Sequence, residues 1–307
     1  MAKRRRRDRP GPAGFLVVDK PAGCTSHDVV DRARGWLGIR RIGHLGTLDP
    51  QATGVLPLAI REATKLVPFF QSSGKSYLGT IRLGVETDTL DGEGEVVSRF
   101  EGTLPDEAEV RAAMAKFVGE IEQIPPMYSA VKRDGVPLHR LARQGEEVQR
   151  DPKKVVIHAL ELLRFESPEI DLRVDCGPGT YVRTLAQDLG QALGCGAHLS
   201  ALRRTRSEPF GLEQALEQAV CEASAKERTL EGRLISPEVA LGLPTTRLAP
   251  PAIDHLGQGR EIAPGDLQRA APGTRFSALD ASGRFVGVIE LRADRRLWPV
   301  RMLPRDG

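Results

Sequence analysis

Cysteine is scarce in this sequence, and its distribution excludes the common cysteine-based sites. The four cysteines, Cys24, Cys176, Cys195 and Cys221, lie far apart in a chain of 307 residues. No pair has CxxC spacing, and none has the Cys/His spacing of a zinc site. We therefore expect reduced thiols, as in a cytoplasmic protein, and no metal site.

Long apolar segments and cofactor motifs are also missing. No apolar run approaches the roughly 20 residues that span a bilayer, and no apolar h-region marks a secretory signal near residue 1. Neither a Walker motif nor a dinucleotide fingerprint is present. With 40% hydrophobic and 28% charged residues, the composition predicts a soluble globular protein that does not contact a membrane.

Positive charge is concentrated at the N terminus, although the net charge is only +3. Residues 1–10, MAKRRRRDRP, hold six basic side chains and one acidic side chain. Such a run buries no apolar surface and predicts a flexible tail. A solvated tail without a task, a nuclear address and a phosphate-binding arm all fit it. The arm is favoured if the rest of the chain binds nucleic acid.

The chain is long enough for one large domain and one small one. We assign the large domain to residues 11–240. Residues 124–150 combine prolines, glycines and many basic side chains, which indicates an excursion from the core. From about Leu241 the sequence becomes rich in proline and glycine, like a boundary. Residues 265–304 then show short strands, a hairpin turn and no helix, so we predict a small β domain over residues 246–307.

Several segments of the large domain have a clear period. Residues 25–38 predict a helix capped by Ser26, and residues 75–84 alternate as a strand does. Residues 197–210 predict a strand with a basic edge. Residues 104–121 predict a helix that ends near its glycine, with these side chains inward: Val110, Met114, Phe117 and Val118.

A single carboxylate, Asp49, stands among the glycines and polar residues of RIGHLGTLDPQATG, residues 41–54. Three roles fit such an aspartate. It could accept backbone N–H groups in a turn before Pro50, ligate a metal, or act as a catalytic nucleophile or base. Only His44 lies near as a second ligand, which disfavours a metal. The flanking glycines would let a substrate approach the backbone closely.

The three tyrosines of the chain all lie near basic residues. Tyr77 follows Lys75, Tyr181 precedes Arg183, and Tyr128 lies in the basic excursion. An enzyme that acts on a nucleic-acid base needs cations for phosphates, an aromatic surface for stacking and an acid/base group. The tyrosines are compatible with RNA as a partner, but each could equally be a core or rim aromatic.

The segment GHLGTLDPQATGVLPLAIREATKL closely resembles the signature of tRNA pseudouridine synthases of the TruB type. Five further segments match that family in order, over most of residues 14–210: VVDKPAGCTSHDVV, KSYLGTIRLGVETDTLDGEG, IEQIPPMYSAVKRDGVPLHRLARQG, CGPGTYVRTLAQDLG and LGCGAHLSALRRTR. The resemblance implies an α/β (α+β) pseudouridine synthase fold, with a mixed, mainly antiparallel central sheet and flanking helices. Residues 246–307 match the family's PUA-like RNA-binding domain only loosely.

The resemblance also implies a reaction. The family flips uridine 55 out of the T loop of tRNA, detaches its base, rotates it and rejoins it through C5, without a cofactor. By resemblance Asp49 is the essential carboxylate, which attacks C1′ of the ribose or removes a proton from C2′. Arg183 would keep that carboxylate ionised. Tyr77 would stack on the flipped base and help to remove the C5 proton.

Four more residues match family positions that we count as substrate-binding. Tyr181 matches a second substrate contact, and Leu202 an apolar contact beneath the base. His44 matches a histidine that fills the space left in the T loop, and Lys20 supports the wall of the active site. Residues 124–150 resemble a thumb loop that closes over RNA.

We expect a monomer in the cytoplasm, with tRNA as its partner and no obligate protein partner. Two alternatives remain. One is a guide-RNA-directed ribosomal RNA enzyme of the same fold, which the near-complete thumb segment disfavours. The other is a catalytically idle RNA-binding or RNA-folding protein, which the set of Asp49, Tyr77 and Arg183 disfavours.

Overall fold

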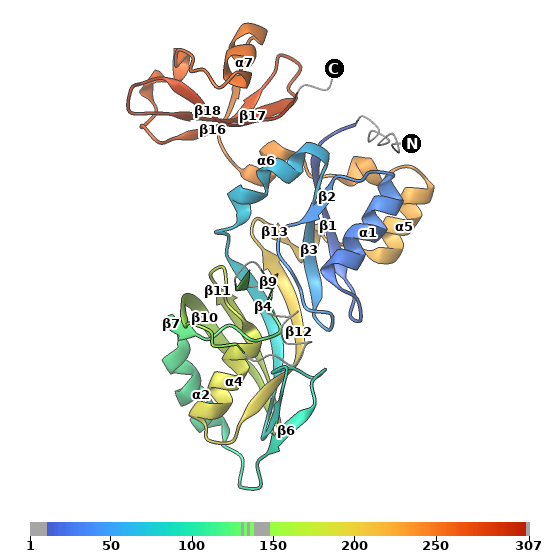
Figure 1. The fold of residues 1–307 in the computed structure, drawn as a ribbon, viewed down its shortest axis with the longest axis vertical. Coiled ribbons are helices and arrows are strands. Elements are labelled where there is room, and N and C mark those ends of the chain that lie inside the picture. Colours follow the sequence, from blue (N-terminus) through green and yellow to red (C-terminus); the bar gives the residue numbers. More distant parts are fainter. Residues whose placement is uncertain (1–10, 130–131, 134–135, 138–147, 305–307) are drawn as a thin grey trace.

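The computed structural model describes residues 11–129, 132–133, 136–137 and 148–304. One large sheet forms the body of the molecule (Figure 1). Its strands are β1 (Gly14–Lys20), β2 (Ile42–His44), β3 (Thr53–Ile60), β4 (Lys75–Leu83), β7 (Gly119–Gln123), β10 (Lys153–Glu166), β11 (Glu169–Cys176), β12 (Ala197–Ser207), β13 (Phe210–Gly211) and β14 (Leu216–Glu217).

The strands are ordered β14-β1-β3-β12-β4-β11-β10-β7, with β2 beside β3 and β13 beside β12. The pairs β1–β14 and β3–β12 are parallel, and the other neighbours in this sheet are antiparallel. The mixed, mainly antiparallel sheet that the resemblance implied is therefore confirmed. The parallel contact between β3 and β12 is short, with the register pairs Arg203–Thr53 and Arg204–Gly54.

Helices cover both ends of the sheet (Figure 1). The helices of the body, with 3₁₀ helices written η, are α1 (Ser26–Leu37), η1 (Arg61–Phe70), α2 (Glu107–Met114), η2 (Ala115–Phe117), α4 (Val182–Ala192), η3 (Leu212–Gln214), α5 (Gln218–Lys226), η4 (Leu230–Arg233) and α6 (Pro237–Leu241). The apolar faces of α1, α2 and α4 pack into one core with residues of the sheet.

Strand β1 shows why this part of the chain is so apolar. Leu16 and Val18 belong to the core under α1, whereas Phe15 and Val17 belong to a second core that includes η1. Successive side chains of a strand point to opposite faces, so β1 is buried on both. Apolar packing on both faces therefore holds β1, and β3 beside it, in place without help from polar contacts.

The predicted cap of α1 is wrong by one residue. Thr25 is the N-cap, because its side chain accepts the Asp28 N–H and the Asp28 carboxylate accepts the Thr25 N–H, which is a capping box. Ser26 is the first helical residue, and its hydroxyl contacts Leu48 instead. A contact that lies 22 positions away decided the role of Ser26, and local sequence does not show such a contact.

The segment 104–121 also differs from its prediction. The helix ends at Met114, a 3₁₀ turn follows to Phe117, and β7 begins at Gly119. Val110 and Met114 are buried as expected, but Val118 is 47% exposed. The helical period stops before Val118, so its direction no longer follows from the face of α2. The alternation predicted for residues 75–84 is confirmed in β4.

Two small hairpins lie outside the large sheet: β5 (Val85–Thr87) pairs with β6 (Val96–Arg99), and β8 (Lys132–Arg133) pairs with β9 (Val136–Pro137). A separate four-stranded sheet lies at the end of the molecule that carries both termini (Figure 1). It contains β15 (Thr245–Arg247), β16 (Arg275–Leu279), β17 (Phe285–Leu291) and β18 (Leu297–Met302), with α7 (Pro250–Gly257) and η5 (Gly265–Arg269) beside them.

The absence of a helix predicted for residues 265–304 is wrong, because η5 is a short 3₁₀ helix there. The proline-rich segment before it, which looked like a boundary, contains β15 and α7: prolines at the first positions of α7 are compatible with a helix start.

This small sheet also contacts the body. Phe285 and Val288 of β17 are buried in the same core as Phe15 of β1. No helix in the described part of the chain is long and apolar enough to cross a membrane.

Candidate active site

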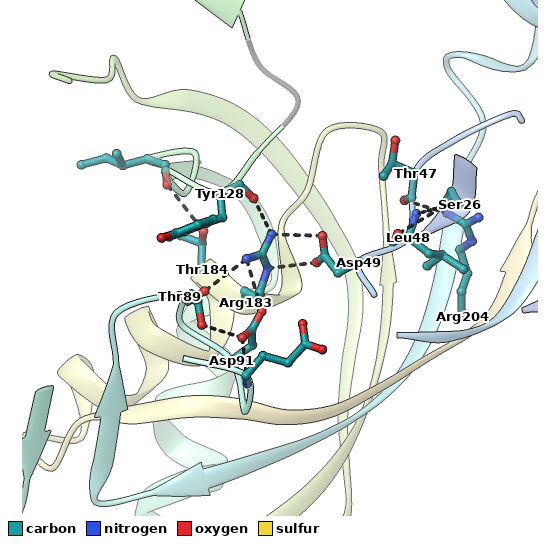
Figure 2. A network of polar contacts seen from close by, with 12 residues as sticks. Ser26, Thr47, Leu48, Asp49, Thr89, Asp91, Tyr128, Arg183, Thr184 and Arg204 are labelled. Carbon is teal, nitrogen blue, oxygen red and sulfur yellow. Dashed lines mark hydrogen bonds and ion pairs between the residues drawn. The ribbon is translucent and has the colours of Figure 1, made fainter. Parts of the chain in front are cut away.

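Asp49 lies in the loop between β2 and β3, residues 45–52. Hydrogen bonds from Ser26 hold this loop at Leu48, the residue before Asp49. The Ser26 hydroxyl accepts the Leu48 N–H at 2.8 Å and donates to the Leu48 carbonyl at 3.1 Å (Figure 2). The Ala52 N–H donates to the Asp49 carbonyl at 3.1 Å. Because both backbone groups of Leu48 are held, the Asp49 side chain leaves the loop in a fixed direction.

Lys20, at the end of β1, holds the part of this loop that follows Asp49. Its side chain is fully buried, and its ammonium donates to the carbonyls of Pro21 at 3.0 Å, Pro50 at 3.0 Å and Ala52 at 2.6 Å. Burial lowers the pKa of Lys20. Since its three protons are used inside the protein, Lys20 fits the supporting role that the resemblance implied, and not a direct contact with substrate.

Arg204, in β12, holds the part of the loop that precedes Asp49. Its Nε donates to the Val55 carbonyl at 2.8 Å and its Nη2 to the Gly46 carbonyl at 3.2 Å. Its Nη1 donates to the Thr47 carbonyl at 3.5 Å (Figure 2). The residue is 1% exposed. The basic edge predicted for residues 197–210 therefore does not include Arg204. In a strand, alternate side chains face opposite sides, and this one faces the interior.

Arg183, in the first turn of α4, pairs with Asp49 through two contacts. Its Nε lies 3.0 Å from Asp49 Oδ2, and its Nη2 donates to Asp49 Oδ1 at 3.2 Å (Figure 2). This bidentate arrangement fixes the plane of the carboxylate as well as its distance. The two residues are 134 positions apart, and the fold brings them together as the resemblance implied.

A second carboxylate shares the same guanidinium. Arg183 Nη1 lies 3.3 Å from Asp91 Oδ2 and donates to the Thr89 carbonyl at 3.1 Å, while Nη2 also donates to the Tyr128 carbonyl at 2.7 Å (Figure 2). Asp91 itself accepts the Thr89 hydroxyl at 2.6 Å. The sequence analysis did not single out Asp91. Its only signal in the sequence is its place in TDTLDGEG, which belongs to a segment that resembles the family but also has the composition of a turn.

Exposure distinguishes the two carboxylates. The Asp49 side chain is 33% exposed, whereas those of Arg183 and Asp91 are each 5% exposed. A molecule approaching from solvent can therefore reach an Asp49 oxygen. Asp91 is positioned to balance the charge of the guanidinium from behind.

The charge state of Asp49 results from opposing effects. Burial raises the pKa of Asp49; the Arg183 charge opposes this, the Asp91 charge adds to it, and Lys20 opposes it. Asp49 Oδ1 accepts an N–H of the Arg183 guanidinium and Oδ2 lies 3.0 Å from its Nε. A guanidinium has no acceptor of its own, so this is the arrangement of an ionised carboxylate. Arg183 thus favours the charged form that burial alone would disfavour.

Tyr77, in β4, stands opposite Arg204 of β12 in the strand register and is 7% exposed. Burial raises the pKa of the Tyr77 hydroxyl, and the charge and hydrogen bond of the Arg204 guanidinium act against this. The Tyr77 side chain is thus largely covered in the protein without RNA. Its stacking role stays a prediction.

The other predicted residues lie on three different elements, β2, α4 with its N-cap, and β12. His44 ends β2, and its Nδ1 accepts the Gly46 N–H at 3.3 Å; burial and then the charge of Arg204 lower the pKa of His44, so the neutral imidazole is favoured. The backbone of Tyr181 is clamped by Gln123 through bonds of 3.0 and 3.2 Å. Leu202 is half-buried in β12 against the main core.

A cavity of about 610 Å³ opens beside the strands that hold Tyr77. Lys75, Arg173 and Arg206 supply positive charge to its lining, and Asp175 and Glu208 supply negative charge. Arg173 pairs with Asp175 at 3.0 Å. No group of three or more potential metal ligands occurs within residues 11–129 and 148–304 or the short described segments between them.

Family models match most of the chain. The model described as "TruB family pseudouridylate synthase (N terminal domain)" matches residues 34–182, and "tRNA pseudouridylate synthase B C-terminal domain" matches residues 183–241. The arginine that pairs with Asp49 is thus the first residue of the second match.

Curated relatives agree with these matches. The chain is 43% identical over 290 residues to the tRNA pseudouridine synthase B of Dehalococcoides mccartyi, covering 94% of this chain and 96% of the relative. It is 54% identical over 210 residues to that of Opitutus terrae, covering 68% and 87%. Among solved structures, a Cbf5-Nop10-Gar1 complex contains a chain that is 28% identical, with a TM-score of 0.67, over 91% of this chain and 78% of that one.

Proposed function

The chain belongs to the TruB family of pseudouridylate synthases, and we propose that it converts uridine 55 in the T loop of tRNA to pseudouridine. The proposal rests on the bidentate pair of Asp49 and Arg183, at 3.0 and 3.2 Å. Asp49 is the exposed member of that pair, and its charge is supported by a buried cation. The curated relatives are named tRNA pseudouridine synthase B, which supports pseudouridine formation in tRNA.

The residues of this chain would divide the reaction as follows. Asp49 either attacks C1′ of the ribose or removes a proton from C2′, and both routes need its ionised carboxylate. Arg183 keeps that carboxylate charged and oriented. The detached base then rotates and rejoins through C5, and the C5 proton is lost as N1 gains one, so that the product is an isomer of the substrate.

Tyr77 would stack on the flipped base, which is worth roughly 1–3 kcal/mol, and its hydroxyl would help to take the C5 proton. Tyr181 and Leu202 would contact the same base, and His44 would fill the space that it leaves in the T loop. Lys20 acts through the loop of Asp49. These roles rest on the family positions that the residues match.

We further propose that residues 124–150 act as a thumb over the RNA, although residues 130–131, 134–135 and 138–147 lie outside the described part. The carbonyl of Tyr128, at the start of this segment, accepts a bond from Arg183 at 2.7 Å. A thumb that moves on binding RNA would therefore act directly on the catalytic arginine. We assign residues 11–240 to the catalytic domain and the small sheet to a PUA-like RNA-binding domain.

The decisive experiment incubates the pure protein with an unmodified tRNA transcript and maps pseudouridine along it. We expect one product at position 55, formed by a monomer in the absence of added protein or guide RNA. We also propose that the enzyme acts in the cytoplasm. A product that appears only with a guide RNA would favour the guide-directed alternative, which the likeness to a Cbf5 complex keeps open. Binding without any product would favour an idle RNA-binding protein.

A further inference from the structure

Arg204 is a buried cation. It is 1% exposed, and in the described part of the chain it forms no ion pair with a carboxylate. Its charged or chargeable neighbours are Lys20, His44 and Lys75, whose protonated forms it disfavours. Burying an unpaired charge is costly, so the site must derive some benefit from a guanidinium here.

Fastening the loop does not by itself require a charge. Three of the acceptors of Arg204 are the backbone carbonyls of Gly46, Thr47 and Val55. The neutral side chains of Ser26 and Gln123 do the same work for nearby backbone groups. A neutral donor would satisfy carbonyls at a smaller desolvation cost. The remaining partner, the Tyr77 hydroxyl, is different, because a phenol can become a phenolate and then gains from a positive neighbour.

The fold fixes Arg204 against both parts of the site. It stands opposite Tyr77 in the β12–β4 register and opposite Gly54 in the β12–β3 register. At Gly54, where φ is +101°, a Cβ would lie 2.1 Å from the Arg204 carbonyl oxygen. The two backbones are therefore in close contact, and the Cα of Arg204 cannot shift relative to β3 without moving a strand.

We propose that Arg204 is a positioning residue that holds the Tyr77 hydroxyl in register with the Asp49 loop. This inference rests on the proposed function, in which that hydroxyl takes part in proton transfer. A single guanidinium would then set the distance between the two reacting side chains. Its planar fork, with donors in several fixed directions, suits this task better than a lysine ammonium does.

The other groups that face Tyr77 act in the opposite direction. Cys176 on β11 and Asp49 in the loop both disfavour its ionised form, as does burial. Arg204 on β12 is the group that opposes all three. Replacing Arg204 by a neutral residue should therefore move the titration of Tyr77 in one direction only, to higher pH.

The chain offers a direct test because it has only three tyrosines. In a Tyr128→Phe/Tyr181→Phe background, 3-fluorotyrosine labels Tyr77 alone, and ¹⁹F NMR follows its titration at a pH that the fold tolerates. We expect Arg204→Gln to raise its pKa by about one unit or more, as loss of an adjacent opposite charge does. An unchanged titration in a folded variant would overturn the proposal.

Arg203→Gln is the matched control. Arg203 is the preceding residue of the same strand, but its guanidinium is paired with Asp19 at 3.0 and 2.6 Å. Its loss removes the same formal charge from β12. The Tyr77 titration should move by less than about a third of the shift in Arg204→Gln, because screening and distance weaken a remote, paired charge. Equal shifts would mean a general charge effect and would also contradict the proposal.

A kinetic cycle tests the link to catalysis, and it uses Arg204→Lys, which retains the charge and a donor. Single-turnover rates at saturating tRNA are compared for Arg204→Lys with tyrosine and with phenylalanine at position 77. We expect a loss of about tenfold or more with Tyr77 and clearly less with phenylalanine, since the two effects share one contact. Equal losses in both backgrounds would show that Arg204 acts through the loop alone. Absence of pseudouridine in every variant and in the wild type would instead reject the proposed function, while the titration still tests the contact.

Discussion

Asp49, Arg183 and Asp91 form a row in which one cation lies between two carboxylates, and only one end of the row meets solvent. Arg183 has two contacts to Asp49, one to Asp91 and two to carbonyls. Such a guanidinium has no freedom to follow a substrate. The Asp49 carboxylate is therefore positioned by the protein itself, and in the role that we propose for it this would lower the entropy cost of reaching the reactive geometry.

Replacing Asp49 by asparagine should abolish product formation and leave RNA affinity nearly unchanged. The amide retains the shape of the carboxylate but neither its charge nor its nucleophilicity, and such groups usually contribute about 100-fold or more. Single-turnover assays beside filter binding provide the measurement. Asp171→Asn is the control, because that aspartate pairs with Arg164 and Thr80 away from Arg183. Turnover of Asp49→Asn above about one per cent of wild type would contradict the role.

The buried position of Asp188 in α4 leads us to predict that the free energy of unfolding depends on pH. Burial raises the pKa of Asp188 from its ordinary 3.8 to about 6. The folded state therefore holds this proton more tightly than the unfolded state, and stability contributed by the protonated form is lost as pH rises from about 4 to about 6. Asp188→Asn should stabilise the protein by about 1–2 kcal/mol at pH 7, which discounts the full shift for partial exposure, and by little at pH 4.

Urea unfolding at the two pH values measures this difference. Asp28→Asn serves as a control of opposite sign, because the hydroxyl and N–H of Thr25 lower the pKa of Asp28. That substitution should destabilise at pH 7 and matter less in acid. A stabilisation by Asp188→Asn that is equally large at pH 4 would show that its cause is not ionisation.

Among the elements, the pair β3 and β12 imposes the strictest local requirement. Gly54→Ala should destabilise the protein by about 2 kcal/mol or more, because the φ of +101° is strained for alanine and its Cβ would lie 2.1 Å from a backbone oxygen. Turnover should fall as well, since the strands move apart beside the Asp49 loop. Thermal unfolding and single-turnover rates measure both effects.

Gly43→Ala is the matched control for that substitution. Gly43 lies in β2, and a Cβ built there meets nothing within 4 Å, so its stability should change by no more than about 0.5 kcal/mol. Equal losses for both variants would mean that strand propensity, and not the close approach of β12, accounts for the effect.

Helices and strands could be predicted from the sequence where the spacing of apolar residues follows a helical or strand period. The alternation of β4 and the apolar face of α1 follow from residues that are near in sequence. The cap of α1 and the burial of Arg204 do not, because Leu48 and Gly46 are distant partners that only the fold supplies. Asp49 and Arg183 were reached through family resemblance, and Asp91 was missed because an aspartate before a glycine is equally typical of a turn.

For the whole molecule, the arginines at the two ends of the chain require separate treatment. The tail, residues 1–10, lies outside the described residues. In the small sheet, Arg292 stacks on Trp298 at 4.7 Å and Arg296 pairs with Glu261 at 3.7 Å, so these side chains already have internal contacts. The small sheet also shares a core with Phe15 and Phe210, so deleting it would expose apolar surface of the body.

Deleting residues 1–10 alone is therefore the cleaner test of electrostatic binding. It should raise the dissociation constant for tRNA and flatten the dependence of log affinity on log salt, by about 0.7–0.9 for each phosphate that the tail would otherwise neutralise. The single-turnover rate at saturating RNA should stay unchanged, because Asp49, Tyr77 and Arg183 remain. A salt series of binding constants beside those rates is the measurement, and an unchanged slope would show that the tail does not meet RNA.

The short parallel contact of β3 with β12 has a consequence for the protein during its synthesis. The ribosome releases β3 and the Asp49 loop early, but Arg183 and the strand that carries Arg204 emerge more than 130 residues later. Until then the loop lacks its contacts with Arg204, and the Asp49 carboxylate lacks its pair with Arg183. A nascent chain arrested before residue 183 holds the aspartate without either arginine, so we expect such fragments not to modify RNA.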